Sequence, residues 1–468
     1  MSDNIGLVIL AAGAGTRLKL DLPKPLAPMC NQRLVSFPVQ AALNFLKVTG
    51  CNGHVGLVLG HGKEEVESYL DQTFSNQQYP LFKAHQVEQK GTADAVRAYL
   101  KDVSDHKKTD VIFILCADTP VISEEELQLL YLALKDNGLD AVAATFETPN
   151  PKGYGRIVKG GKGFKIVEEK DANEEQRKIT EVNSGLYAIK TSYLLDRISN
   201  INDNNKSGEF YLTDIFSEDA NVAPVLFEDE SLFIGVNDLA QLQTAERNLR
   251  WKHMRKLRDE GVRFIDLSHT YIDPSVEIGS GTVVYPNVFA EGKTVIGKNC
   301  VIEPGSIIRN SILEDEVEIK AYSHLEDSVV RKAADIGPYG RLRPGSDIGS
   351  HAKIGNFVEV KKSILEEGVK VSHLSYVGDA EIGENTNIGC GFITCNYDGA
   401  QKHKTKIGKN SFIGSDSQMI APVELGDSCY VASGSTINQN MPGGSFAIAR
   451  AKQVTKENMA KRFIKSKS

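Results

Sequence analysis

Residues 272–308 read IDPSVEIGSGTVVYPNVFAEGKTVIGKNCVIEPGSII, and an apolar residue recurs at every sixth position. A helix repeats about every 3.6 residues and a strand alternates every two, so neither produces this period. A parallel β-helix does, because each flat face turns an apolar side chain inward and each corner takes a small residue. The stretch therefore predicts a solenoid of hexapeptide repeats.

The same spacing continues beyond this stretch. It runs in two further registers, which are Ile336, Leu342, Ile348, Ile354 and Val360, and then Ile407, Ile413, Met419, Leu425, Val431 and Ile437. We expect a purely structural role for most of these residues, so function should lie where the spacing breaks. The breaks are expected to cluster between Arg341 and His403.

Toward the N-terminus the pattern changes. Leucines among many charges, ending at Gly261, predict one connecting helix over 238–261. Before it, apolar runs alternate with helical patterns, which indicates a mostly parallel α/β sheet. The expected fold is thus α/β plus a β-solenoid, with domains at 1–237 and 262–468. Expected strands are Ile5–Leu10, His54–Gly60, Asp110–Cys116 and Asp140–Glu147, and expected helices include Lys63–Leu70 and Ser123–Lys135.

The composition excludes several classes of protein. The 468 residues include 54 Lys and Arg against 61 Asp and Glu, a formal net charge of −7 that does not favour broad adhesion to nucleic acid or anionic membranes. There is no signal-like N-terminus and no apolar run long enough to span a bilayer. Seven scattered cysteines without CxxC pairs predict reduced thiols and a cytoplasmic location.

A Gly-rich turn follows the first expected strand and reads Leu10-Ala11-Ala12-Gly13-Ala14-Gly15-Thr16-Arg17. Small residues let backbone N–H groups approach a phosphate or a base. Alone, this could equally be an ordinary strand-to-helix turn. Lys24, held between two prolines, follows shortly afterwards. With Arg17 it supplies two cations suited to a triphosphate and to the charge that develops when it is cleaved.

This combination resembles the sugar-nucleotide pyrophosphorylase family, and further matching motifs continue to Gly235-Val236-Asn237. The resemblance implies a Rossmann-like nucleotidyltransferase domain that transfers a uridylyl group from UTP to a sugar 1-phosphate. It also implies catalytic roles for Arg17 and Lys24, and Mg²⁺ ligands in Asp118 and Asn237. The substrate contacts that it implies are Leu10, Ala11, Ala12, Gly13, Lys24, Gln86, Gly91, Thr92, Cys116, Ala117, Asp118, Gly155, Glu168, Asn183 and Asn237.

Within that set the resemblance divides the work. Gln86 with Gly91 and Thr92 would recognise uracil, and the sugar would be held by Gly155, Glu168 and Asn183. Taken singly, Asp118 could be a strand-end cap and Lys24 a solvated charge, but their joint order favours a site. Ala14 stands where the family often has Lys and Ala117 where it has Gly, so we expect altered rate or triphosphate affinity rather than loss of activity.

The second half carries its own candidate chemistry. Arg341 and Arg343 supply guanidiniums, Lys361 follows near the next turn, and His373 interrupts a repeat in which small residues are the rule. A lone His is more often structural, but these cations and a polar loop at 394–404 accompany this one. A neutral imidazole is a suitable base for an amine attacking a thioester, and loop N–H groups could stabilise the oxyanion.

These features resemble the bacterial family of bifunctional N-acetylglucosamine-1-phosphate uridylyltransferases and glucosamine-1-phosphate N-acetyltransferases, over nearly the whole chain. The resemblance implies a left-handed β-helix, a homotrimer with sites between subunits, acetyl-CoA as co-substrate and a role in bacterial envelope synthesis. It makes His373 the general base. It further implies glucosamine 1-phosphate ligands in Arg343, Lys361, Tyr376 and Asn387, reacting-group contacts in Asn396 and Tyr397, and an acetyl-CoA path along Cys390, Ser415, Ser433 and Arg450.

Cys390 and Phe392 replace small residues common in the family, so the pantetheine passage is expected to be narrower. The basic tail, which includes Lys465 and Lys467, could approach CoA phosphates, or could simply be a solvated end. Two alternatives remain. One is a monofunctional nucleotidyltransferase on a structural β-helix, and the other is a non-catalytic assembly subunit. His373 with its loop disfavours the first, and intact Arg17, Lys24, Asp118 and Asn237 disfavour the second.

Overall fold

The computed structural model describes residues 3–13 and 15–464, so Ala14, Lys465 and Lys467 lie outside the described residues. The chain forms two compact units, Met1–Leu249 and Arg250–Ser468, each with its own hydrophobic core. Among the described residues every helix is too short or too polar to cross a membrane.

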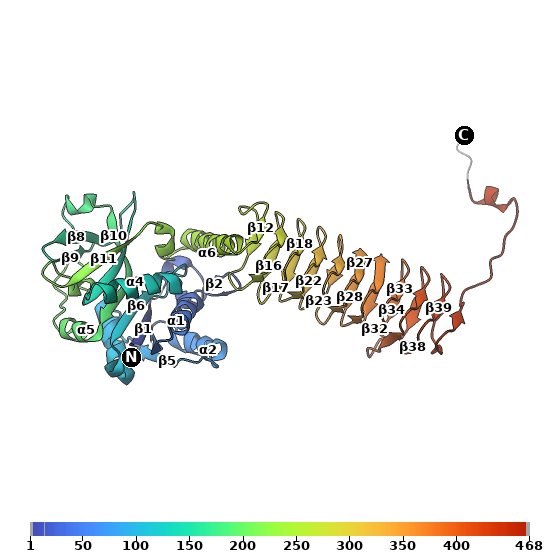
Figure 1. Ribbon diagram of the computed structural model, residues 1–468, viewed down its shortest axis with the longest axis horizontal. Coiled ribbons are helices and arrows are strands. Elements are labelled where there is room, and N and C mark those ends of the chain that lie inside the picture. Colours follow the sequence, from blue (N-terminus) through green and yellow to red (C-terminus); the bar gives the residue numbers. More distant parts are fainter. Residues whose placement is uncertain (1–2, 14, 465–468) are drawn as a thin grey trace. The chain divides into compact units, whose positions relative to one another are not determined.

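The first unit is built on one mixed, mostly parallel sheet (Figure 1). Its central strands are parallel, whereas β10 runs antiparallel to both of its neighbours. In spatial order the strands are β11 (Val222–Phe227), β7 (Ala141–Glu147), β10 (Glu181–Lys190), β6 (Val111–Cys116), β1 (Asn4–Ala11), β4 (Asn52–Leu59) and β5 (Leu81–His85). In addition, β8 (Arg156–Gly160) pairs with β10, and β9 (Gly163–Val167) pairs with β8. A separate hairpin joins β2 (Pro28–Met29) to β3 (Gln32–Arg33).

Helices cover both faces of this sheet. Apolar residues of α1 (Ser36–Thr49), α2 (Lys63–Thr73) and α4 (Glu124–Asp136) fill the core on one face. Those of α3 (Thr92–Asp102) and α5 (Thr191–Ile198) fill the core on the other. The expected α/β architecture is therefore confirmed.

Local sequence signals place these elements closely. The four expected strands fall on β1, β4, β6 and β7, each within two residues at either end. The capping box at the start of α4 is present: the Ser123 side chain and the Glu126 carboxylate each bind the other residue's backbone. Such caps satisfy N–H groups that the first helical turn leaves without partners.

Helix α6 (Leu239–Asp259) lies where the connecting helix is expected, and it contains the Leu249/Arg250 boundary between the two units. Its last residues belong to the solenoid core, in which Met254 and Leu257 are buried. The chain leaves the helix at Gly261, whose φ of 101° is a conformation that favours glycine.

The second unit is a solenoid whose short strands form three parallel sheets, here called the first, second and third faces (Figure 1). The first face contains β12 (Arg263–Phe264), β15 (Val283–Val284), β18 (Val301–Ile302), β21 (Glu318–Ile319), β24 (Asp335–Ile336), β27 (Lys353–Asn356), β30 (Lys370–His373), β33 (Asn387–Ile388), β36 (Phe412–Ile413), β39 (Tyr430–Val431) and β41 (Phe446–Ala447).

The other two faces are built in the same way. The second face contains β13 (Tyr271–Ile272), β16 (Phe289–Glu291), β19 (Ile307–Arg309), β22 (His324–Glu326), β25 (Arg341–Leu342), β28 (Glu359–Lys361), β31 (Tyr376–Gly378), β34 (Ile393–Cys395), β37 (Gln418–Ile420) and β40 (Thr436–Ile437). The third face contains β14 (Glu277–Ile278), β17 (Val295–Ile296), β20 (Ile312–Leu313), β23 (Val329–Val330), β26 (Asp347–Ile348), β29 (Ile364–Leu365), β32 (Ala380–Ile382), β35 (Thr405–Ile407) and β38 (Val423–Leu425).

The apolar residues of the six-residue registers all point into the solenoid core. The expectation that register breaks cluster between Arg341 and His403 is wrong in part. Two earlier breaks occur where the chain passes from the second to the third face, from Ile308 to Leu313 and from Leu325 to Val330. Each of these corners is one residue shorter and contains a residue with positive φ, Asn310 and Asp327 respectively.

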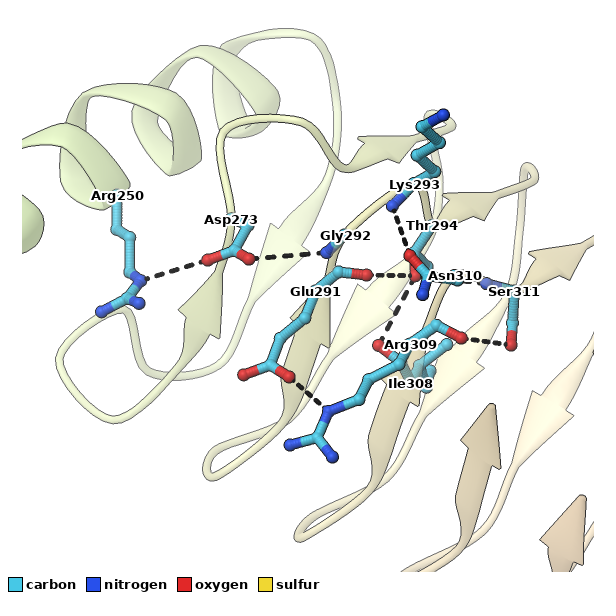
Figure 2. A network of polar contacts seen from close by, with 10 residues as sticks. All are labelled: Arg250, Asp273, Glu291, Gly292, Lys293, Thr294, Ile308, Arg309, Asn310 and Ser311. Carbon is cyan, nitrogen blue, oxygen red and sulfur yellow. Dashed lines mark hydrogen bonds and ion pairs between the residues drawn. The ribbon is translucent and has the colours of Figure 1, made fainter. Parts of the chain in front are cut away.

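Polar side chains join successive coils at the corners, as Figure 2 shows for the first coils. The Lys293 backbone N–H donates to Asn310 Oδ1 at 3.1 Å, and the Ser311 N–H donates to Thr294 Oγ1 at 3.4 Å. Arg250 of α6 pairs with the buried Asp273 at 3.6 Å. The buried groups among these, the Ser311 N–H and the Asp273 carboxylate, thereby gain partners that water cannot supply.

Candidate active sites

Four polar residues converge at the carboxyl end of the central strands in the first unit. Lys24 Nζ lies 2.5 Å from Asp118 Oδ2 and 3.1 Å from Asn237 Oδ1, and Arg17 Nη2 also donates to Asn237 Oδ1 at 3.1 Å. The Val236 N–H donates to the Asp118 carbonyl at 2.8 Å, which brings the segment before α6 to the end of β6. Residues up to 220 positions apart thus form one cluster. Neither Lys24 nor Asp118 is a free surface group, since their side chains are 13% and 27% exposed.

The proposed metal ligands fit a hard cation. Asp118 and Asn237 present oxygen atoms to the same point, because one ammonium group contacts both. Mg²⁺ favours such oxygen donors and usually takes only one or two carboxylates, with waters and substrate phosphates as the other ligands. Among the described residues no group of three or more His, Cys, Asp and Glu gathers into a cage made of protein alone.

The Gly-rich turn is held against the same sheet edge. Leu10 is paired with Cys116 in the sheet, and its carbonyl accepts from the Ala117 N–H at 2.9 Å. The Ala12 carbonyl accepts from Gln89 Nε2 at 2.5 Å. Ala11 ends β1 and Gly13 follows in the exposed turn. Burial raises the pKa of the Cys116 thiol to about 12, so at this edge it is a neutral group.

The expected uracil-binding residues lie together at the start of α3. Gln86 Nε2 donates to the Gly91 carbonyl at 3.2 Å and to Asp94 Oδ2 at 2.8 Å. Gly91 has φ 116°, and any side chain there would collide with the Phe210 backbone. Thr92 Oγ1 accepts from the Leu212 N–H at 3.0 Å. The amide of Gln86 is therefore held in one orientation, as recognition of a base edge requires.

The expected sugar-binding residues are also neighbours. The Asn183 N–H donates to the Gly155 carbonyl at 2.9 Å, and a Cβ on Gly155 would lie 3.6 Å from Glu168 Oε1. Thr213, which sequence reasoning missed, donates to Glu168 Oε1 at 3.0 Å. Burial, with help from the nearby carboxylates of Asp214, Asp171 and Glu209, raises the pKa of Glu168.

In the second unit the candidate base lies on a corner of the solenoid. His373 ends β30 on the first face, three residues after Lys370. Lys370, Asn387, Phe412 and Tyr430 stack in register on successive coils. Three residues after each of these comes a corner residue, so that one stripe is formed by His373, Cys390, Ser415 and Ser433. Arg450 extends it, because its Nη1 donates to the Ser433 carbonyl at 2.8 Å.

Three of the four expected glucosamine 1-phosphate ligands, Arg343, Lys361 and Tyr376, lie on the second face or at the corner after it. The Glu359 carboxylate accepts a hydrogen bond from Arg343 at 2.8 Å, and Glu359 pairs in register with Tyr376 on the next coil. The Tyr376 hydroxyl lies beside Gly378, which is the register partner of Lys361. Lys402 is a close neighbour of Lys361 and is the main cause that lowers its pKa, with Arg343 contributing. A lysine whose pKa is lowered by neighbouring cations marks a place where an anion would be stabilised. Sequence reasoning assigned no role to Lys402 or Glu359.

The polar loop is a separate ordered structure. Asn396 Nδ2 donates to Asp379 Oδ2 at 2.5 Å, and Tyr397 bridges to Lys402 across the loop. Asp398 accepts from the Ala400 and Gln401 N–H groups at 2.8 and 2.6 Å, and from His403 at 2.7 Å. The Gln401 backbone bond, followed by the other two contacts, holds the pKa of Asp398 well below its usual value.

The expected ligands of the acetyltransferase site are divided between two faces of the solenoid. Asn387 projects from the first face, whereas Arg343, Lys361 and Tyr376 belong to the second face or the corner after it. The expectation that Phe392 narrows the pantetheine passage is wrong, because its side chain is 0% exposed and lies in the solenoid core. Cys390, in contrast, is exposed on the corner stripe.

Comparison with known families divides the chain in the same way. The family model described as Nucleotidyl transferase matches residues 7–230. Two models match the second unit, a GMPPB C-terminal domain at 267–346 and a Bacterial transferase hexapeptide of six repeats at 404–439. With the three stacked sheets, the hexapeptide match confirms the expected left-handed parallel β-helix.

Curated relatives match along nearly the whole chain. A protein named Bifunctional protein GlmU from Geotalea uraniireducens is 43% identical over 463 residues, covering 97% of this chain and 98% of its own. Proteins of that name from Thermosipho melanesiensis and Pelobacter propionicus are 42% and 40% identical, covering 96% and 97% of this chain and 96% and 98% of their own. These relatives therefore contain both units.

Proposed function

Since this chain belongs to the family of the bifunctional protein GlmU, we propose how its two units divide the family's two reactions. The protein is a bifunctional transferase, a UDP-N-acetylglucosamine diphosphorylase and a glucosamine-1-phosphate N-acetyltransferase. We assign uridylyl transfer to residues 1–237 and acetyl transfer to residues 262–468, with 238–261 as the linker helix. Because UTP and acetyl-CoA are intracellular metabolites, a cytoplasmic location is part of this proposal.

Acetyl transfer is assigned to the corner stripe and the second face. The phosphate of glucosamine 1-phosphate would bind the cations Arg343, Lys361 and Lys402, which places the sugar amine near the corner. His373 would take a proton from this amine as it attacks the thioester of acetyl-CoA, and the CoA thiolate would leave. The acetyl-CoA would run along the stripe of Cys390, Ser415, Ser433 and Arg450, with Asn396 and Tyr397 beside the reacting groups.

Uridylyl transfer is assigned to the sheet edge of the first unit. A phosphate oxygen of N-acetylglucosamine 1-phosphate would attack the α-phosphorus of UTP, and pyrophosphate would leave. This reaction depends on positioning and charge neutralisation rather than on a protein nucleophile. Lys24 and Arg17 would hold the triphosphate, the Gln86 pocket the uracil, and Gly155, Glu168 and Asn183 the sugar.

Asp118 and Asn237 would hold Mg²⁺, which would neutralise phosphate charge when bound. In this chain Lys24 already contacts both ligands, so the ammonium group and the two oxygen ligands form one unit. Binding of nucleotide phosphates would draw the Lys24 side chain from the carboxylate toward the more numerous negative oxygens of the substrate.

We further propose a homotrimer in which one subunit's second face meets a neighbour's first face. Arg343, Lys361 and Tyr376 are separated from Asn387 by a corner of the solenoid, and the outer surface of a corner is convex. A convex surface cannot enclose a small substrate, so a site that uses both faces calls for a second subunit. Closed symmetric assemblies are the usual form of such heterologous contacts.

The observation that carries the two-site proposal is the convergence of Arg17, Lys24, Asp118 and Asn237 in one unit, while His373 and its cations lie in the other. The test is to supply the purified protein with each substrate pair separately. UTP with N-acetylglucosamine 1-phosphate should release pyrophosphate only with Mg²⁺. Acetyl-CoA with glucosamine 1-phosphate should release CoA thiol even with a metal chelator present. Absence of thiol release would leave a pyrophosphorylase on a structural β-helix.

A further inference from the structure

The segment Gly355-Asn356 lies beside the candidate base but has no part in the roles assigned above. Asn356 ends β27 and His373 ends β30, and the register pairs the two residues directly. His373 Nδ1 lies 2.8 Å from Asn356 Oδ1. The Asn356 carbonyl also accepts from the Leu374 N–H at 3.1 Å. Asn356 therefore contacts both the imidazole and the backbone that follows it.

A neutral imidazole carries its proton on one nitrogen only, and the other nitrogen accepts. Donation from Nδ1–H to an amide oxygen leaves the lone pair on Nε2, directed away from Asn356. We propose that Asn356 is a positioning residue for acetyl transfer: its side-chain oxygen holds the Nδ1–H tautomer of His373 and aims Nε2 at the substrate amine. The inference rests on the proposed role of His373 as general base.

The backbone is built to bring these two side chains together. A Cβ on Gly355 would collide with the carbonyl of Ser372, so glycine is what allows β27 to approach β30 this closely. The β27 and β30 strands are also the longest on the first face, four residues each, and both end at the pair. The contact between Asn356 and His373 thus depends on the absence of a side chain at Gly355, one position before Asn356.

The neutral amide matters as much as its position. The titratable groups on the strands and corners beside this pair include Lys353, Glu359 and Lys361 on the coil of Asn356, Lys370 and Tyr376 on that of His373, and Cys390 on the next. An amide orients the ring without adding a charge to this set. A carboxylate in its place would favour the imidazolium, which cannot accept a proton.

The experiment compares Asn356→Ala and Asn356→Asp with the wild type, in acetyl transfer measured as kcat and KM across the neutral pH range. Asn356→Ala should lower kcat about tenfold to a hundredfold, with both KM values within about twofold, because orientation of the base is lost while binding remains. Asn356→Asp should move the acid limb of the pH profile upward by about one pH unit and recover most of the rate at alkaline pH.

The matched control is Asn310→Ala. It removes another hydrogen bond between coils that an asparagine side-chain amide accepts, at a corner far from the base (Figure 2). It should leave acetyl transfer unchanged, and uridylyl transfer should be unchanged in every variant as a check on folding. A normal rate and pH profile in Asn356→Ala would overturn the inference, as would equal losses in the Ala and Asp variants with an unshifted profile.

The experiment also separates this inference from the function on which it rests. If the wild type fails to acetylate, or His373→Ala keeps the full rate, the proposed function and this inference fall together. If His373→Ala abolishes acetylation and Asn356→Ala does not impair it, only the positioning role is wrong.

Discussion

The two units assemble their candidate sites in opposite ways. In the first, loops that follow β1 and β6 and the segment before α6 meet at one sheet edge, and direct bonds join Arg17, Lys24, Asp118 and Asn237 within a single chain. In the second, residues at equivalent positions of successive coils stack in lines, and the expected ligands lie on a corner and on two faces of the solenoid. A sheet edge gathers distant segments into a concave site, whereas a solenoid displays its residues outward. We propose that the first site is complete within one subunit and that the second requires a neighbour.

The largest effect is expected from the solenoid core, where Phe392 was wrongly expected to narrow the acetyl-CoA path. Replacing this fully buried ring with Ala should destabilise the second unit by about 3–5 kcal/mol, because it leaves a cavity between coils. Chemical denaturation of the full chain should show the second unit unfolding earlier and the first unit unchanged. An unchanged denaturation midpoint with a raised KM for acetyl-CoA would instead place Phe392 in the path.

The proposed division of the second site between subunits can be tested by mixing two inactive variants. Arg343→Ala alters the second face and Asn387→Ala the first, and each should lower acetyl transfer by about 2 kcal/mol or more through a lost substrate contact. When the two proteins are unfolded and refolded together, random assembly should restore up to about a quarter of the sites. Mixed trimers that stay as inactive as the separate variants would show that both residues act from one subunit. A mixture of Lys24→Ala with Asn237→Ala, both in the first unit, should show no such recovery of uridylyl transfer.

Glu168→Gln tests the proposal that the first site is complete within one subunit. Burial raises the pKa of this carboxyl, so its charge is lost as the pH falls through a value above the usual range for glutamate. In the wild type the KM for N-acetylglucosamine 1-phosphate should therefore rise on acidification. The Gln variant should raise this KM about tenfold and flatten its pH dependence.

Stability gives the control for the same variant. A raised carboxyl pKa means that the folded state binds the proton more tightly than the unfolded state, so this group adds stability as the pH falls and costs stability at neutral pH. Glu168→Gln should accordingly keep or increase the melting temperature at pH 7. A lower melting temperature with unchanged KM would make Glu168 a structural residue.

The smallest effect is expected at the polar loop of the second unit. Its carboxylate Asp398 has a lowered pKa, so the contribution of the charged form is present throughout the neutral range and is lost only as the pH falls through the lowered value. Asp398→Asn should loosen the loop and raise the KM for glucosamine 1-phosphate about threefold to tenfold, while kcat/KM for uridylyl transfer stays the same. If Asp398→Asn keeps wild-type activity in both reactions, the loop has no part in the acetyltransferase site.

The sequence predicts the architecture closely because the signals that determine it are local. The six-residue registers and the capping box at Ser123 depend on neighbours within a few residues, and the structure confirms both. Whether an apolar residue points inward also follows from the register, whereas a comparison of Phe392 with the family's small residues places it wrongly. Phe392 lies two residues before Thr394, which stands in the inward register of the second face, and this position turns its side chain inward as well.

What remained hidden depends on contacts between distant segments. Thr213 reaches Glu168 from 45 residues away, and Asn356 meets His373 only because the coils stack 17 residues apart. A role for Lys402 is indicated only by its contact with Lys361, which ends β28, whereas Lys402 belongs to the polar loop. The sequence signal that pairs Asn356 with His373 is the 17-residue coil, which contains one shortened corner.

The central claim is that one chain holds two independent catalytic sites. The most direct test assays both reactions in Lys24→Ala and His373→Ala. Lys24→Ala should lower uridylyl transfer by about a hundredfold to a thousandfold and leave acetyl transfer at the wild-type rate, and His373→Ala should do the reverse. Loss of both activities in either variant, with the protein still folded, would contradict two independent sites.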